Sequence, residues 1–184
     1  MRKVVSGLFI ALDGVAESPH EWQFEFDAEM GQSMDEQIAR VDAILLGRVT
    51  YQEWVNYWPN GPDDEFASFI NSTPKVVVST TLDKVAWGTY DNITLIKGNV
   101  ADEIASLKQQ PGKDILVTGS PTLVQSLLHA DLLDELILLV HPVVAGKGKR
   151  LFRDGQPLKR LHLVNATTTS SGVAILTYQP RRDG

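Results

Sequence analysis

The sequence of 184 residues contains no cysteine. This absence excludes disulfide bonds, thiolate metal sites and cysteine nucleophiles. Histidine is scarce, and its four copies are too scattered to pair at the spacing of metal ligands, so no metal site is predicted. No apolar stretch approaches the roughly 20 residues that span a membrane, so we expect no membrane partner.

The chain also has fewer basic than acidic residues. Lysine and arginine number 17 against 23 aspartates and glutamates, and the formal net charge is -6. A nucleic-acid partner requires a basic face, so this balance argues against one. Hydrophobic residues make up 43% of the chain and charged residues 22%, which is ordinary for a soluble globular protein. We therefore expect a cytoplasmic protein that forms a single domain over residues 1–184.

Strands and helices alternate along the chain until about residue 130, and strands dominate after it. Apolar and β-branched runs predict strands at 4–12, 43–47, 75–79, 93–96, 115–117, 135–140, 161–168 and 172–178. Amphipathic spacing and caps predict helices at 28–41, 63–71, 101–108 and 122–130. Alternating βα units that end in an antiparallel hairpin indicate an α/β fold, with a mixed, mostly parallel sheet and helices on both faces.

One apolar strand ends in a glycine, a cation and the start of a helix. Gly47 permits close approach of another molecule, because no Cβ stands in the way. Arg48 adds a permanent, fork-shaped cation. Thr50 is the expected N-cap of the next helix, whose free amides favour an anion. Together these residues predict a phosphate site, and the alternative is a plain strand-to-helix turn with Arg48 in solvent.

A second strand, 115–117, ends in the same manner. Ser120 is a strong N-cap candidate, and Pro121 would occupy the first helical position, where its missing N–H costs nothing. Strand ends of this kind bind nucleotides in open α/β sheets, and two of them suggest a dinucleotide. The alternative is an ordinary capped helix. The candidate cofactor-binding residues at the two strand ends are Gly47, Arg48, Val49, Thr50, Thr118, Gly119, Ser120, Pro121 and Thr122.

The two segments also carry a family resemblance. Residues 46–51 (Leu-Gly-Arg-Val-Thr-Tyr) resemble the Gly-Arg-x-Thr segment of dihydrofolate reductase-like proteins. Residues 12–15, 116–120, 132–136 and 142–148 are similar to the reductase domain of bacterial riboflavin biosynthesis proteins, and the resemblance extends from Lys3 to Tyr178. It implies a dihydrofolate reductase-like three-layer fold, NADPH as cofactor and a homodimer. The implied activity resembles that of a 5-amino-6-(5-phosphoribosylamino)uracil reductase.

The resemblance implies further contacts with the cofactor. Ser79 and Thr80, at the end of the strand 75–79, match a position beside the adenosine ribose and its 2′-phosphate. The alternative for this pair is a turn built by side-chain-to-backbone bonds. Ala11 and Val15 flank the loop that would approach the nicotinamide.

The substrate pocket is predicted from three residues before and at the first helix. Hydride transfer to a C=N bond requires a proton source near the nitrogen. Asp27 is the best positional match to the catalytic carboxylate of dihydrofolate reductases, and its alternative role is N-cap of the helix that begins at residue 28. Asp13 and Trp22 are the candidate substrate-binding residues.

Two other functions stay open beside a heterocycle reductase of the riboflavin type. One is a dihydrofolate reductase, although the chain lacks the Pro-Trp-x-Leu-Pro pattern expected between the first strand and first helix. The other is a non-catalytic NADP-binding protein. The strand 136–140 is apolar on both faces, and the strand 173–178 is expected near a sheet edge. Long apolar edges are normally covered, so we expect a homodimer formed largely through these strands.

Overall fold

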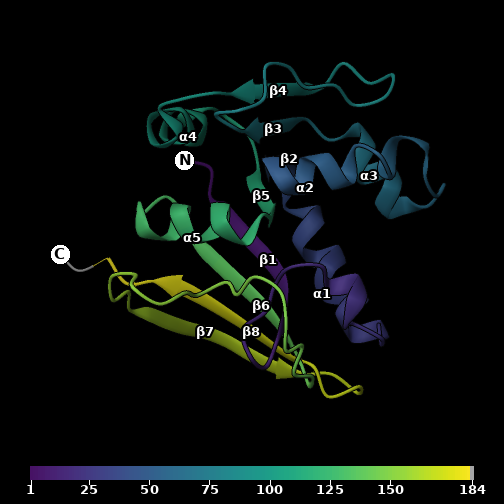
Figure 1. The fold of residues 1–184 in the computed structure, drawn as a ribbon, viewed down its shortest axis with the longest axis vertical. Coiled ribbons are helices and arrows are strands. Elements are labelled where there is room, and N and C mark those ends of the chain that lie inside the picture. Colours follow the sequence, from purple (N-terminus) through teal and green to yellow (C-terminus); the bar gives the residue numbers. More distant parts are fainter. Residues whose placement is uncertain (183–184) are drawn as a thin grey trace.

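An eight-stranded sheet runs through the protein (Figure 1). The strands are β1 (Val4–Ala11), β2 (Val41–Gly47), β3 (Lys75–Val78), β4 (Ile93–Ile96), β5 (Asp114–Gly119), β6 (Glu135–His141), β7 (Leu161–Thr168) and β8 (Ala174–Pro180). The computed structural model describes residues 1–182. The strand order is β4-β3-β2-β5-β1-β6-β8-β7. The first six strands run parallel, whereas β8 is antiparallel to β6 and β7 antiparallel to β8. The predicted α/β fold with its C-terminal hairpin is confirmed.

Helices cover both faces of the sheet. They are α1 (Ala28–Ala39), α2 (Arg48–Trp54), α3 (Glu65–Ser72), α4 (Val100–Gln109) and α5 (Pro121–His129), with short 3-10 helices η1 (Pro19–Glu21) and η2 (Trp58–Asn60). Figure 1 shows α4 and α5 on one side of the sheet and α1, α2 and α3 on the other, which gives three layers. None of the helices in residues 1–182 combines the length and the apolar character needed to cross a membrane.

Local side-chain chemistry explains where three helices begin. Asp27, Asp64 and Ser120 precede α1, α3 and α5, and each side chain accepts a hydrogen bond from the amide three residues later. Such caps satisfy one of the backbone donors that a helix start leaves unpaired. Asn99 precedes α4, but its side chain makes no capping bond.

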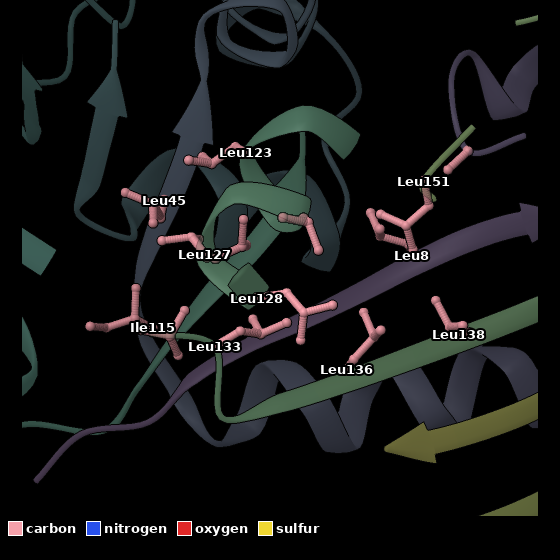
Figure 2. Packing of buried hydrophobic residues seen from close by; sticks show 14 of the residues in the cluster. Leu8, Leu45, Ile115, Leu123, Leu127, Leu128, Leu133, Leu136, Leu138 and Leu151 are labelled. Carbon is pink, nitrogen blue, oxygen red and sulfur yellow. The ribbon is translucent and has the colours of Figure 1, made fainter. Parts of the chain in front are cut away.

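The largest hydrophobic cluster lies between the sheet and the layer of α4 and α5. Figure 2 shows Leu123, Leu127 and Leu128 of α5 directed at side chains from the strands, among them Leu45 and Ile115. Leu127 is 1% exposed. Burial of a leucine side chain contributes about 1.5–3 kcal/mol to folding, so this face anchors α5 and fixes where it begins.

The strand order shows which strand of the C-terminal hairpin forms the sheet edge. Residues 136–140 belong to β6, which is paired with β1 on one side and with β8 on the other. The edge strand on this side of the sheet is β7, which is mostly exposed and carries Leu163 and Val164 with 47% and 49% of their surface accessible. Its neighbour β8 contains most of residues 173–178, so the prediction that these residues lie near a sheet edge is confirmed.

A buried lysine joins α3 to β3. Lys75 is 1% exposed, and its Nζ donates to the carbonyl oxygens of Asn71 at 3.1 Å and Thr73 at 2.6 Å. The ammonium also lies 4.7 Å from the centre of the Trp87 ring. No carboxylate in residues 1–182 forms an ion pair with it. Burial lowers the pKa of Lys75 to about 8, because the charged form loses its hydration.

This lowered pKa predicts how stability depends on pH. Between pH 8 and about 10.5 the unfolded chain holds a proton on Lys75 that the folded chain has released, so the free energy of unfolding rises with pH. The cost of burying the charge is fully present below pH 8. Relative to Lys75→Met, the wild type should gain about 2–3 kcal/mol between pH 8 and pH 10, measured by urea unfolding. A difference that stays constant over this range would contradict the assignment.

Candidate functional site

A cleft of about 540 Å³ opens where β2 and β5 end, and the middle of β1 also lines it. Residues of α1, α2, η2 and α3 complete its lining. The open end meets the start of α5 and residues 16–19. Ligands of open α/β sheets bind beyond the carboxyl ends of the parallel strands. The cleft is therefore the candidate functional site.

The ends of β2 and β5 meet so closely that two glycines are required there. A Cβ on Gly47 would come within 2.7 Å of Ser120 Oγ and 2.9 Å of its backbone nitrogen. A Cβ on Gly119 would lie 2.6 Å from Thr50 Oγ1. The prediction that Gly47 leaves room for another molecule is thus corrected, because Ser120 of the same chain fills that space.

The two predicted helix caps have different outcomes. The N-cap of α2 is Gly47, and Thr50 is a buried residue inside the helix, so the prediction for Thr50 is wrong. Its hydroxyl lies against Gly119 instead of at the helix start. The prediction for α5 is confirmed: Ser120 Oγ accepts from the Leu123 amide at 3.4 Å, and Pro121 is the first helical residue.

The lining of the cleft contains one cation that no carboxylate neutralises. Arg48 is exposed and donates from Nη1 to Gln52 Oε1 at 3.0 Å, and no ion pair within residues 1–182 involves it. Lys149 also lines the cleft, but its Nζ lies 3.9 Å from Glu17 Oε1. Arg48 is therefore free to bind an anion with its planar fork of donors.

The inner half of the cleft is apolar and aromatic. Trp54 and Trp58 lie edge to face with ring centres 5.9 Å apart, and Trp58 meets Phe66 at 5.3 Å. Met34 and Ile38 of α1 also line the cleft. A cleft lined by aromatic and aliphatic side chains suits a flat ring, because apolar contact and ring stacking both favour it.

The structure brings most of the predicted strand-end residues together in this cleft. The predicted site residues that line it are Arg48, Val49, Thr50, Thr118, Gly119, Ser120, Pro121 and Thr122. Those that do not line it are Ala11, Asp13, Val15, Trp22, Asp27, Gly47, Ser79 and Thr80.

The residues predicted to extend the cofactor site have structural partners. Ser79 Oγ accepts from the amides of Thr81 at 3.2 Å and Leu82 at 3.1 Å, which is the turn considered as its alternative. Thr80 is exposed at the same turn. Ala11 and Val15 are buried and joined by a hydrogen bond from the Ala11 amide to the Val15 carbonyl. Their contact with a cofactor stays a prediction.

Asp13 and Trp22 organise the loops beside the cleft. The Asp13 carboxylate accepts from the amides of Ala145 at 3.3 Å and Gly146 at 2.8 Å, which ties the loop after β1 to the loop after β6. Those amide bonds, the one from Gly146 first, lower the pKa of Asp13. Trp22 is 7% exposed, donates to the Glu17 carbonyl at 3.0 Å and lies against His141.

Asp27 caps α1 and anchors the C-terminal hairpin. Its carboxylate accepts from the Met30 amide at 2.9 Å and from the Ser171 amide at 3.1 Å. Desolvation acts to raise the pKa of Asp27, but hydrogen bonds from Ser171, Thr169 and Met30 outweigh it and hold the pKa well below its usual range. The carboxyl is thus ionised at neutral pH, and the geometry favours the N-cap role. Proton donation by Asp27 stays a prediction.

Several residues of the cleft were missed by the sequence analysis. Gln37 lies over Gly7 in the middle of β1, where a Cβ would come within 2.2 Å of Gln37 Oε1. Trp54 and Trp58 follow the Gly-Arg segment at helical spacing, which is a signal that could have placed them on its wall. The contact of Gln37 with Gly7 joins elements 30 residues apart and has no local signal.

Comparisons with known proteins agree with this geometry. Residues 2–175 match the family described as the RibD C-terminal domain. The chain is 34% identical over 185 residues to the uncharacterized protein YyaP of Bacillus subtilis, covering 96% of this chain and 94% of that protein.

Two solved structures share the fold. A putative riboflavin biosynthesis protein from Shewanella sp. PV-4 superimposes with a TM-score of 0.80 at 22% identity, over 98% of this chain and 99% of that one. A dihydrofolate reductase from Enterococcus faecalis, complexed with NADP(H), superimposes with a TM-score of 0.63 at 12% identity. The match covers 98% of this chain and 97% of that one. The fold is therefore dihydrofolate reductase-like, and the chain belongs to the RibD C-terminal domain family.

Proposed function

We propose that the protein is an NADPH-dependent reductase of a heterocyclic substrate, similar in its reaction to 5-amino-6-(5-phosphoribosylamino)uracil reductases. One observation carries the proposal. A single cleft joins a polar end, formed by Arg48 and the start of α5, to an inner half walled by Trp54, Trp58 and Phe66. The polar end suits a phosphate-bearing cofactor and the inner half suits a flat ring.

The residues at the polar end fit NADPH. Arg48 is free for a phosphate, and the amides at the start of α5 carry the positive end of the helix dipole. Bound NADPH would supply a hydride to the substrate. Thr50 and Ser120 hold the ends of β2 and β5 together, so that Arg48 and α5 face the same space. The helices that line the cleft exclude water from the ring.

Turnover with a panel of heterocycles tests the proposal. We expect NADPH oxidation, followed at 340 nm, with an aminouracil substrate and a kcat/KM for dihydrofolate below about 10⁴ M⁻¹s⁻¹. Dihydrofolate should react slowly because the carboxylates of its glutamate tail need cations. Within residues 1–182, Arg48 is the one cation lining the cleft without a carboxylate partner. Efficient dihydrofolate reduction would favour a folate reductase. NADPH binding without oxidation of any substrate would favour a non-catalytic NADP-binding protein.

We also propose that the protein forms a homodimer through the C-terminal hairpin. The edge strand β7 exposes its backbone groups together with Leu163 and Val164, and such edges are normally covered. A two-fold partner is the commonest cover in soluble proteins. Light scattering at micromolar concentration should give about twice the chain mass of 20.3 kDa. A mass near that of one chain would contradict the proposal.

A further inference from the structure

We infer that the substrate of the proposed reductase is an uncharged, planar heterocycle without a phosphate group, and that Gln37 and Thr118 bind the polar edge of its ring. The inference rests on the proposed function, because it names the class of substrate for the same cleft. Four features of the inner half carry it: a buried carboxamide, an unpartnered hydroxyl, the distribution of charge and the shape of the walls.

The carboxamide belongs to Gln37 on α1. Its side chain lines the cleft and is 93% covered, with 7% of the residue exposed. Nε2 donates to the Ser33 carbonyl at 3.3 Å, and within residues 1–182 this is the one hydrogen bond of the side chain. Gly7 leaves the space that Oε1 occupies, since a Cβ there would come within 2.2 Å. A glycine inside a strand weakens the strand, and here it admits a polar group to the floor of an apolar cleft.

The hydroxyl belongs to Thr118, at the end of β5. Thr118 lines the cleft, and its Oγ1 is shielded from water without any hydrogen-bond partner in residues 1–182. A buried hydroxyl without a partner costs stability, so its presence on the floor calls for a partner from outside the chain. Ser6 of β1 is paired with Val117 of β5, and the next residues along these two strands are Gly7 and Thr118. Because Gln37 lies over Gly7, its carboxamide and the Thr118 side chain lie above adjacent strands.

Charge in the cleft disfavours a phosphate on the substrate. Arg48 and Lys149 are the lysine and arginine residues that line it within residues 1–182. Lys149 is paired with Glu17, and the proposed function assigns Arg48 to the cofactor. Glu53 adds a negative charge on the wall formed by α2. A substrate phosphate held inside the cleft would therefore lack a counter-charge, which is unfavourable.

The walls favour a flat ring over an extended or aliphatic group. Trp54, Trp58 and Phe66 line the cleft in edge-to-face contact, and Met34 and Ile38 line it as well. A planar ring gains apolar contact with these side chains, while its edge meets Gln37 and Thr118 on the floor. Because both groups are neutral, they favour ring carbonyl and amino groups over ionised ones.

A matched pair of probes that differ only in a phosphate tests the inference. We would load the protein with saturating NADP⁺ and titrate 5-aminouridine or 5-aminouridine 5′-phosphate, following quenching of the tryptophans in the cleft. The nucleoside should bind, and the phosphate should weaken binding by about 10-fold, since an unpaired buried anion must lose its hydration. Tighter binding of the phosphate, or no binding of the nucleoside at millimolar concentration, would overturn the inference.

Variants on the floor test the two named residues. Gln37→Met and Thr118→Val should each weaken the affinity for 5-aminouridine by about 5- to 10-fold, because each removes a hydrogen bond to the ring. Thr118→Ser keeps the hydroxyl, so it should bind 5-aminouridine as the wild type does. Thr118→Val should not lower Tm, because the hydroxyl has no partner inside the protein. Gly7→Ala should also weaken binding of the nucleoside, because the new Cβ displaces the Gln37 side chain. The fold should survive, since that side chain is flexible.

Gln125 supplies the matched control. It is a buried glutamine on α5 that does not line the cleft, so Gln125→Met should leave the nucleoside affinity unchanged. NADP⁺ affinity, measured for every variant, separates the two proposals. If the wild type binds no NADP⁺, the proposed function fails. If NADP⁺ binds equally to all variants and the nucleoside affinity does not change at Gln37 or Thr118, only the inference fails.

Discussion

Replacing Arg48 with alanine should weaken NADPH binding by about 10- to 100-fold and change NADH binding by only a few-fold. The reason is the 2′-phosphate, which NADPH carries and NADH lacks. A hydrogen bond to a charged group contributes roughly 1.5–3 kcal/mol, and about 1.4 kcal/mol corresponds to a tenfold change in affinity. Arg48 lines the cleft without an ion-pair partner in residues 1–182, so its charge is available to the ligand. Calorimetric titration with both nucleotides measures the effect.

Two further variants make the result specific. Arg48→Lys should recover part of the loss, because the charge returns without the two-pronged geometry. Gln52→Ala removes the group that accepts from Arg48 Nη1 and should leave NADPH affinity nearly unchanged. Equal losses of NADPH and NADH in Arg48→Ala would place the guanidinium on the shared pyrophosphate. No loss of either would make Arg48 a solvated surface residue.

Gly119→Ala should lower the free energy of unfolding by about 2–6 kcal/mol and abolish measurable NADPH binding. The new Cβ would lie 2.6 Å from Thr50 Oγ1, and crowding of this kind costs about 1–3 kcal/mol. Gly119 also has φ of +149°, a backbone conformation that costs alanine about 1–3 kcal/mol more. The strain falls where β5 meets β2, so it separates Arg48 from the start of α5. Urea unfolding and calorimetry measure the two effects.

Gly98 provides the matched control for this substitution. No atom lies within 4 Å of the position that a Cβ on Gly98 would take, and its φ requires no glycine. Gly98→Ala should therefore leave stability and NADPH affinity unchanged. Near wild-type stability in Gly119→Ala would show that Thr50 can move aside, and would contradict the close packing of the two strand ends.

The parts of the fold that depend on local chemistry could be predicted from the sequence. The Ser120-Pro121 start of α5 is one example, because the cap bonds to an amide only three residues away. Asp27 is another, since its capping role was recognised beside the catalytic one. The final hairpin and the helices on both faces followed from the order of the predicted strands and helices, and the resemblance to a known family added the dihydrofolate reductase-like fold.

The parts that depend on contacts between distant elements could not be predicted. Thr50 has the side chain of a helix cap, but its hydroxyl is placed against Gly119 of another strand. Gly7 gives no hint in the sequence that it makes room for Gln37. The sheet edge is a further example: the sequence predicts that residues 173–178 lie near it, but not which strand of the hairpin is the outermost one.

Mapping of NADP⁺ on the protein by two-dimensional amide NMR tests the central claim most directly. With ¹⁵N-labelled protein, NADP⁺ should shift the amide signals of Arg48, Val49, Ser120 and Thr122, which line the polar end of the cleft. A later addition of 5-aminouridine should shift those of Gly7 and Thr118. Shifts confined to residues outside the cleft, such as the basic group of Lys159, Arg160, Arg181 and Arg182, would contradict the proposal that this cleft binds the cofactor.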